Sequence, residues 1–391
     1  MRLSGLARRG LAAVTIATTA LLVGSTGTLL GVCGPFTDVS AFCSEVLEIF
    51  YLGITTGTTA TTYDPASNVS RLQMAIFLSR SADRLLQRGS RRAALKQFWT
   101  PQNDTVVKLT TVGAGPYLVE SDGADLWVAN NEGASVSRVR GSDGRLLETW
   151  TGATLALGVL VAAGNVFATG NGSPGSLYRI DPSQAAGAVT TVASNLGNGP
   201  RGVTFDGSRI WTAGGDAPGS VSIVTPGAAI PWTVTTIAMG GLSSLRGALF
   251  DGANVWVTDY SGQTLLKLDG SGAVLQTVTI GAGPQFPVFD GTNIWAANRD
   301  SNSVSVVRAS SGAVLATLTG NGLNVPRAAA FDGQRVLVAS SFGPAVSLWK
   351  AADLTALGTF STGAGTFPIG ACSDGVHFWV TLQIANKLAR F

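Results

Sequence analysis

From residue 104 to the C-terminus, short stretches of alternating apolar and polar residues recur between glycine-rich turns. The clearest copy is Phe289–Val307, FDGTNIWAANRDSNSVSVV, in which Asp-Gly is followed by Ile-Trp, a polar loop and an alternating Val-Ser-Val run. A period of two is typical of half-buried β-strands, and Asp-Gly favours a tight hairpin turn. The pattern therefore predicts short strands joined by tight turns.

This stretch returns seven times, at spacings of 39 to 45 residues between turn glycines. Those glycines are Gly123, Gly164, Gly207, Gly252, Gly291, Gly333 and Gly375. Trp lies four residues later in most copies; Leu337 replaces it in the sixth, and the second copy has Ala168 there with Phe167 beside it. Seven units of four strands predict a mainly β chain in which residues 104–391 form a seven-bladed β-propeller. We interpret the repeated Trp as core packing between blades.

The two ends of the repeat predict how the ring closes. The last copy, His377–Phe391, stops one strand short, whereas Thr105–Thr111 (TVVKLTT) precedes the first copy and has no blade of its own. We predict that this segment is the outer strand of the seventh blade, which would remove two exposed sheet edges.

The first 32 residues predict an export signal. Arg2, Arg8 and Arg9 precede the uncharged run Leu11–Val32. Its 22 residues are just long enough to span a bilayer, so a retained anchor is the alternative to a cleaved signal. Many Thr and Gly residues favour cleavage. Cys33 and Cys43 then form a disulfide outside the cell or remain two separate thiols.

Residues 33–99 predict a small helical module. Apolar residues have helical spacing in Glu45–Tyr51 and again after Ser70. The blocks PFTDVS, LGITTG, TYDP and NVSRLQMAIFLSR, over Pro35–Arg84, resemble one S-layer homology (SLH) repeat, a module that attaches bacterial surface proteins to cell-wall polysaccharide. The resemblance implies that Arg71 binds the anionic polymer; the alternative is a solvated helix residue. Gln73 replaces the acid of the family motif, and one copy is present where three are usual.

Charge is concentrated in the N-terminal quarter. Residues 1–103 contain ten Lys/Arg and five Asp/Glu, whereas residues 104–391 contain sixteen and eighteen. A basic helical segment over 82–100 predicts either contact with anionic polymer or lipid, or an ordinary solvated face. The sequence TPQND (100–104) then marks the domain boundary. The propeller has no charge signature of nucleic-acid binding.

The variable positions of the repeat predict a cationic mouth. Six residues before each turn glycine, where the chain enters the inner strand of a blade, the sequence has Tyr117, Gly158, Arg201, Arg246, Gln285, Arg327 and Ile369. The second strand ends on the same face with Asn130, Asn171, Asp259, Asn298 and Ser340. We predict that Tyr117, Arg201, Arg246, Gln285, Arg327, Asp259 and Asn298 bind an anionic small molecule, glycan or protein. The alternative is that each Arg packs across its own loop and pairs with a carbonyl or with Asp259.

The sequence predicts no catalytic residue, metal site or cofactor. The propeller resembles the secreted YVTN and NHL-like group, which includes the virginiamycin B lyase family; lyase and lactonase relatives use His or clustered acids around a divalent metal. Here the single His377 follows a turn on the opposite face, and six of the eighteen propeller acids are turn Asp residues. We therefore predict a secreted, cell-wall-associated surface protein with a non-catalytic binding propeller. The alternative is a wall-tethered propeller lyase or lactonase.

Overall fold

The computed structural model describes residues 36–39, 43–51, 55, 58–59, 61–71, 73–78, 81 and 108–391 except 243. The chain divides into two compact units, Met1–Leu85 and Leu86–Phe391, which are described separately. The predicted export signal, Cys33 and the whole of the basic segment 82–100 lie outside the described residues. In the described part of the chain, no helix is long and apolar enough to cross a membrane.

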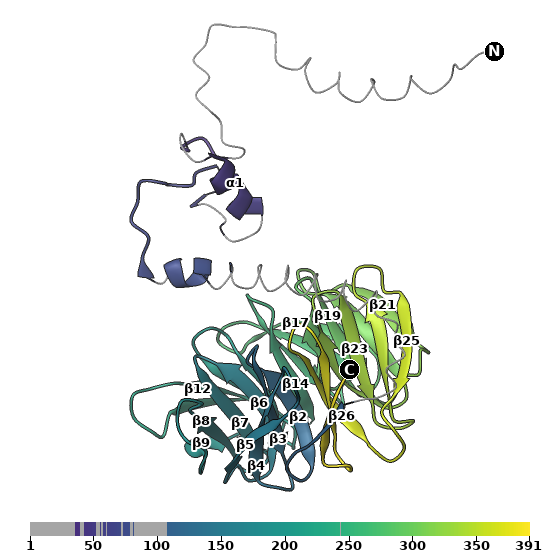
Figure 1. The fold of residues 1–391 in the computed structure, drawn as a ribbon. Helices are drawn as coiled ribbons and strands as arrows, with labels where there is room; N and C mark the ends of the chain where they lie inside the picture. Colours follow the sequence, from purple (N-terminus) through teal and green to yellow (C-terminus); the bar gives the residue numbers. More distant parts are fainter. Residues whose placement is uncertain are drawn as a thin grey trace, which may run out of the picture. The chain divides into compact units, whose positions relative to one another are not determined.

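The second unit is a ring of seven antiparallel four-stranded sheets, as predicted (Figure 1). In each blade the strands run from the inner to the outer edge. Blades 1 to 3 comprise β2 Pro116–Ser121, β3 Asp125–Asn130, β4 Ser135–Arg140 and β5 Leu146–Thr151; β6 Ala156–Ala162, β7 Asn165–Gly170, β8 Gly175–Ile180 and β9 Thr190–Leu196; and β10 Pro200–Phe205, β11 Ile210–Gly214, β12 Ser220–Thr225 and β13 Thr233–Ala238.

The remaining blades repeat this order. Blades 4 to 6 comprise β14 Leu245–Phe250, β15 Val255–Asp259, β16 Thr264–Leu268 and β17 Val274–Thr279; β18 Val288–Phe289, β19 Asn293–Asn298, β20 Ser303–Arg308 and β21 Val314–Thr319; and β22 Pro326–Phe331, β23 Arg335–Ser340, β24 Ala345–Lys350 and β25 Ala356–Ser361. Blade 7 contains β26 Pro368–Ser373, β27 Phe378–Leu382, β28 Lys387–Arg390 and β1 Lys108–Thr111.

The predicted closure of the ring is confirmed. Strand β1 pairs antiparallel with β28, from Lys108 opposite Arg390 to Thr111 opposite Lys387. The Lys387 Nζ also donates to the Thr111 Oγ1 at 3.0 Å. In Figure 1 the yellow C-terminal strands accordingly lie beside the blue strands of the first blade. The ring is therefore closed by pairing the two ends of the repeat.

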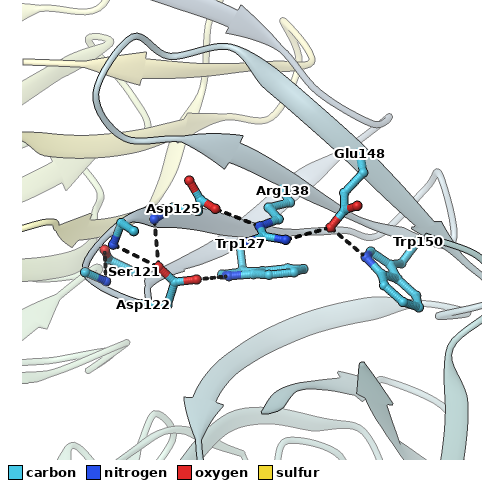
Figure 2. Close-up of polar contacts among 9 residues, drawn as sticks. Ser121, Asp122, Asp125, Trp127, Arg138, Glu148 and Trp150 are labelled. Atoms are coloured by element: carbon cyan, nitrogen blue, oxygen red, sulfur yellow. Dashed lines mark hydrogen bonds and ion pairs between the residues drawn. The ribbon is translucent and has the colours of Figure 1, made fainter. Parts of the chain in front are cut away.

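The repeated turn Asp has two functions in the fold. Figure 2 shows Asp122, whose Oδ1 accepts hydrogen bonds from the backbone N–H groups of Ala124 and Asp125. Its Oδ2 accepts the indole Nε1–H of Trp127 at 2.9 Å. The same Asp-to-indole bond, 2.7 Å long, recurs in the pairs Asp206–Trp211, Asp251–Trp256, Asp290–Trp295 and Asp374–Trp379. One carboxylate thus shapes the turn and fixes the core residue beside it.

The tryptophans pack between blades, which confirms their interpretation as core. Trp127 of blade 1 is fully buried and packs with Val159 and Val166 of blade 2. Its outer side is covered by Arg138, whose guanidinium lies 5.0 Å from the ring centroid and pairs with Asp125 and Glu148 (Figure 2). Burying a large aromatic side chain between blades is a main source of stability in such a ring, and six of the seven blades have one at this position.

The second blade departs from the predicted register. Its inner hairpin closes through a two-residue turn, Ala163-Gly164, and both residues have positive φ. The hairpin has the same length as that of blade 1, but its glycine lies one position later, so counting from Gly164 is wrong by one position. Phe167 therefore takes the place of the Trp, and Leu157, instead of Gly158, is the second residue of the inner strand.

The described part of the first unit contains helix α1 (Cys43–Tyr51), further helical residues at 71 and 73–78, and a small aromatic core. The Phe36 ring lies 5.0 Å from Phe50 and 5.5 Å from Tyr63, centroid to centroid. The Asp38 carboxylate accepts the backbone N–H of Tyr63 at 2.8 Å, which lowers the pKa of Asp38. These contacts join the PFTDVS and TYDP blocks. Cys43 is disulfide-bonded, which agrees with the predicted disulfide alternative.

Ring closure generates a stability prediction. Deleting Lys108–Thr111 from the full chain exposes the edge of β28 and removes four residue pairings, so the melting temperature should fall by several degrees. Leu109→Ala is the matched control, because this side chain is about half exposed and its removal leaves the strand pairing in place. Thermal unfolding followed by circular dichroism measures both. A deletion variant that melts with the wild type would contradict the closure.

Candidate functional site: the arginine cluster

The entry face is the end of the ring at which each inner strand begins. Two loops of each blade meet there, joined by one repeated hydrogen bond. The residue after the second strand donates its backbone N–H to the carbonyl oxygen at or just before the start of the inner strand. The donor–acceptor pairs are Asn131–Gly115, Asn171–Leu155, Gly215–Gly199, Tyr260–Ser244, Arg299–Gly283, Ser341–Val325 and Gln383–Phe367.

Close approach of neighbouring inner strands fixes the residues of this face. A Cβ on Gly158 would lie 2.3 Å from the Arg201 carbonyl oxygen, and one on Gly370 would lie 2.3 Å from that of Tyr117. Only glycine fits these positions. A register shift just before these glycines marks a β-bulge, which re-aims the adjacent side chain. The predicted entry residues are therefore held by the ring itself.

Three predicted arginines do converge, together with a fourth. Arg201, Arg246, Arg299 and Arg327 come from blades 3 to 6 and are called the arginine cluster. Burial lowers the pKa of Arg246, and the charges of Arg201 and Arg327 lower it further. Burial likewise lowers the pKa of Arg327, helped by the charge of Arg299. The four cations are thus close enough to repel one another.

The positive charge of the cluster is incompletely neutralised. Arg201 pairs with Asp216 and Arg299 with Asp300, each at 3.4 Å, and both carboxylates are about half exposed. Such exposed pairs contribute at most about 1 kcal/mol. Arg327 donates its Nε–H to the Ser341 Oγ at 3.1 Å. Within the described residues, Arg246 has no carboxylate partner.

Several donors of the cluster are unused. The Nε atoms of Arg201, Arg246 and Arg299 are buried and have no hydrogen-bond partner among the described residues. A buried donor without a partner costs about 1–3 kcal/mol, more when it is charged. The cluster therefore combines surplus charge with unsatisfied donors, which is the arrangement that a bound anion would relieve.

Aromatic side chains surround these cations. The Arg246 guanidinium lies 4.9 Å from the Tyr260 ring centroid, and the Arg299 Nη1 donates to the Tyr260 Oη at 2.6 Å. Tyr117 of blade 1 packs edge-on against Phe286 of blade 5, with centroids 6.1 Å apart. Because blades 1 and 5 are not neighbours, this pair reaches across the ring at the entry face.

The other predicted residues do not reach the face. Gln285 is 2% exposed, and Asp259 and Asn298 are fully buried. The Asn298 Nδ2 donates to the Oγ atoms of Ser303 and Ser305 within its own blade. The Asp259 carboxylate has no hydrogen-bond partner, so the expected alternative of an arginine pairing with it is wrong. The last residue of the second strand points into the protein core, because side chains alternate between the two faces of a strand.

The residues that sequence reasoning missed are the next ones along the chain. Tyr260, Arg299 and Ser341 each follow the second strand by one residue; Arg299 belongs to the arginine cluster, and Tyr260 and Ser341 contact it. Counting eight residues after the turn glycine instead of seven identifies all three. The sequence contains this repeat position, but choosing it requires knowing which residues of the second strand face the core.

Glu120 was also missed. It lies in β2, three residues after Tyr117, opposite Trp127 in the hairpin register. Its side chain is exposed, yet the surrounding protein excludes enough water to raise its pKa from about 4.5 to about 7. Burial and the Glu120 charge raise the pKa of the Cys372 thiol of blade 7. A carboxyl that water reaches but protein encloses, near two inner strands, lies toward the centre of the ring.

Comparison of the blades gives the sequence signal for Glu120. The same register position is uncharged in every other blade: Leu160, Thr204, Leu249, Val288, Ala330 and Cys372. A single acid at an otherwise apolar or neutral position identifies it. Its raised pKa depends on packing between blades, which the sequence alone does not give.

The described residues contain no group of three or more His, Cys, Asp or Glu side chains able to hold a metal ion. His377 lies beside the turn Asp374, with Nδ1 and Oδ2 3.6 Å apart, at the end of the blade opposite the entry face. This is the predicted turn position.

Known structures share this fold at low identity. A streptogramin B lyase aligns with 73% of this chain and 97% of its own, with a TM-score of 0.61 and 16% identity. Virginiamycin B lyase from Staphylococcus aureus aligns with 73% of this chain and 99% of its own, with a TM-score of 0.61 and 17% identity. Hydrazine synthase from Kuenenia stuttgartiensis aligns with 74% of this chain and 98% of its own, with a TM-score of 0.61 and 15% identity. Such identities show the propeller fold alone. No protein-family model and no curated protein matches the chain.

The raised pKa of Glu120 predicts a pH dependence of stability. Below pH 4.5 the group is protonated in both folded and unfolded chains. As pH rises towards 7, the unfolded chain releases this proton first, so Glu120 progressively destabilises the folded state; above pH 7 the effect is constant. Glu120→Gln should therefore raise the melting temperature at pH 8 and remove this part of the pH dependence.

The matched control for this prediction is Glu132→Gln, because Glu132 is an exposed acid of the same blade. It should keep the wild-type pH profile. Thermal melts between pH 4 and pH 8 distinguish the variants. The account fails if the Glu120→Gln and wild-type profiles run parallel.

Proposed function

We propose that the propeller is a non-catalytic binding module for anionic ligands and that the arginine cluster is its binding site. One observation carries the proposal. Four guanidinium groups from consecutive blades converge on the entry face, and among the described residues they form ion pairs with two half-exposed carboxylates, Asp216 and Asp300. Guanidinium groups bind carboxylate and phosphate through paired, charge-assisted hydrogen bonds.

The arrangement is unfavourable without an anion and favourable with one. Mutual repulsion and burial both disfavour the charged forms of Arg246 and Arg327. A bound carboxylate or phosphate supplies the missing negative charge and accepts hydrogen bonds from donors that otherwise have none. Relief of this repulsion and desolvation then contributes to the free energy of ligand binding.

One observation favours a second candidate, an extracellular propeller lyase or lactonase. Glu120 has a pKa of about 7, in the range suited to a general base. It lies on the same strand as Tyr117, toward the centre of the ring. This candidate requires that Glu120→Gln abolish turnover of a ligand while leaving its binding intact; the binding-module proposal requires no turnover.

We further propose that the chain is exported and docks on anionic cell-wall polysaccharide through an SLH-like module. The support is the local geometry around Arg71, an exposed residue at the start of a helical segment. Ser70 and Gln73 form a reciprocal cap, with Ser70 N donating to Gln73 Oε1 at 2.9 Å and Gln73 N to Ser70 Oγ at 3.2 Å. Gln73 thus keeps the capping geometry that an acid would provide, and Arg71 is free to face the polymer.

Wall docking predicts that Arg71→Gln weakens sedimentation of the full chain with isolated cell walls by several fold, since one charge-assisted contact is lost. Arg140→Gln is the matched control, because Arg140 is an exposed arginine of the propeller. Equal sedimentation of the two variants would remove Arg71 from the docking site.

Anion binding predicts that the Arg246→Gln and Arg327→Gln variants each bind inorganic phosphate and galacturonate about tenfold more weakly than the wild type, because each removes one charged donor. Isothermal titration at low ionic strength measures the affinities. Arg140→Gln again serves as the control, since Arg140 lies on the opposite end of its blade. Unchanged affinity in both cluster variants would rule this site out.

A further inference from the structure

The entry face has an exposed apolar part beside the arginine cluster. Phe342 and Ile384, in the loops after the second strands of blades 6 and 7, are 60% and 67% exposed. Leu155, in the loop that enters blade 2, is 44% exposed. The cations come from blades 3 to 6, whereas these apolar residues come from blades 6, 7 and 2. One face thus carries a cationic part and an apolar part.

Phe367 joins the two parts. The Arg327 guanidinium lies 5.8 Å from the centroid of its ring. The ring of Phe367 in turn packs edge-on against Phe342, with centroids 6.2 Å apart. A continuous path therefore leads from Arg327, a half-buried cation of the cluster, across the half-buried ring of Phe367 to the exposed ring of Phe342. The cationic and apolar surfaces are contiguous.

The backbone supports a functional interpretation of the apolar residues. The residue just before the inner strand has positive φ, between 54° and 70°, in six of the blades. Blades 1, 3 and 5 use glycine there, namely Gly115, Gly199 and Gly283, whereas blades 2, 6 and 7 have Leu155, Val325 and Phe367. Large apolar residues are strained in this region, and such strain concentrates at ligand sites. Three blades retain apolar side chains where glycine would fit better.

Resting on the anion-binding function proposed above, we propose that the ligand is an amphiphilic acid. Its single carboxylate or phosphate binds the arginine cluster, and its aromatic or branched apolar body lies over Phe367 and Phe342. Charge complementarity with the cluster determines the acidic end. The exposed rings, contiguous with Arg327, determine the apolar end. A polar acid such as a uronic acid would use only half of this face.

Three small probes separate the two parts of the site. The probe 4-phenylbutyrate has both an acid and an apolar body, acetate has only the acid, and 4-phenylbutanol has only the body. Isothermal titration should show that the full-length protein binds 4-phenylbutyrate at least about tenfold more tightly than either partial probe. Inorganic phosphate serves as a fourth probe, for anion binding alone.

Two variants complete the test. Phe342→Ala with Ile384→Ala removes exposed side chains, so the protein should still melt near the wild-type temperature. It should lose most of the preference for 4-phenylbutyrate over acetate and keep its phosphate affinity. Arg246→Gln should weaken phosphate, acetate and 4-phenylbutyrate together.

The outcomes distinguish this inference from the proposed function. If phosphate binds but the affinities for acetate and 4-phenylbutyrate are equal, the amphiphilic ligand is overturned while anion binding stands. The same conclusion follows if the double variant at Phe342 and Ile384 still binds 4-phenylbutyrate more tightly than acetate. If 4-phenylbutanol binds as tightly as 4-phenylbutyrate, the acidic end is overturned. If no anion binds, both proposals fail.

Discussion

The hydrogen bond from an indole N–H to a turn aspartate is the interaction on which the rest of the ring depends. It buries a tryptophan at a blade interface without leaving its only polar group unsatisfied. The same carboxylate caps the turn between the first two strands, so the position of the core residue and the register of the hairpin are set together. Where Leu337 replaces the tryptophan, Asp332 binds Arg335 instead, and the turn is retained.

That register also determines what reaches the entry face. Once the turn is fixed, the strand alternation buries Asn298 and Asp259 and directs the following residues, Arg299 and Tyr260, towards the arginine cluster. The residues that repeat in every blade build a stable ring. This stability allows a few positions that differ between blades to carry residues that destabilise the folded state. The cluster, the strained residues Leu155 and Phe367, and the enclosed Glu120 are such positions.

The repeat made most of the fold predictable from the sequence. Turn glycines and tryptophans at constant spacing gave the seven blades, and the unpaired segment before the first copy gave the closing strand. The convergence of Arg201, Arg246 and Arg327 also followed from equivalent positions. Two details did not follow, because they depend on single-residue geometry: the displaced glycine in the turn at Ala163 and the position of the residue after each second strand. The raised pKa of Glu120 reflects desolvation by the surrounding protein, which no local pattern records.

The central claim is that the arginine cluster carries surplus positive charge that a ligand must neutralise. The most direct measurement is the melting temperature of Arg246→Gln, compared with the wild type and with Arg140→Gln, in a buffer free of multivalent anions. Because Arg246 is half-buried and repelled by neighbouring cations, its neutralisation should raise the melting temperature by a few degrees. Arg140→Gln should change it little. A lower melting temperature for Arg246→Gln would contradict the account.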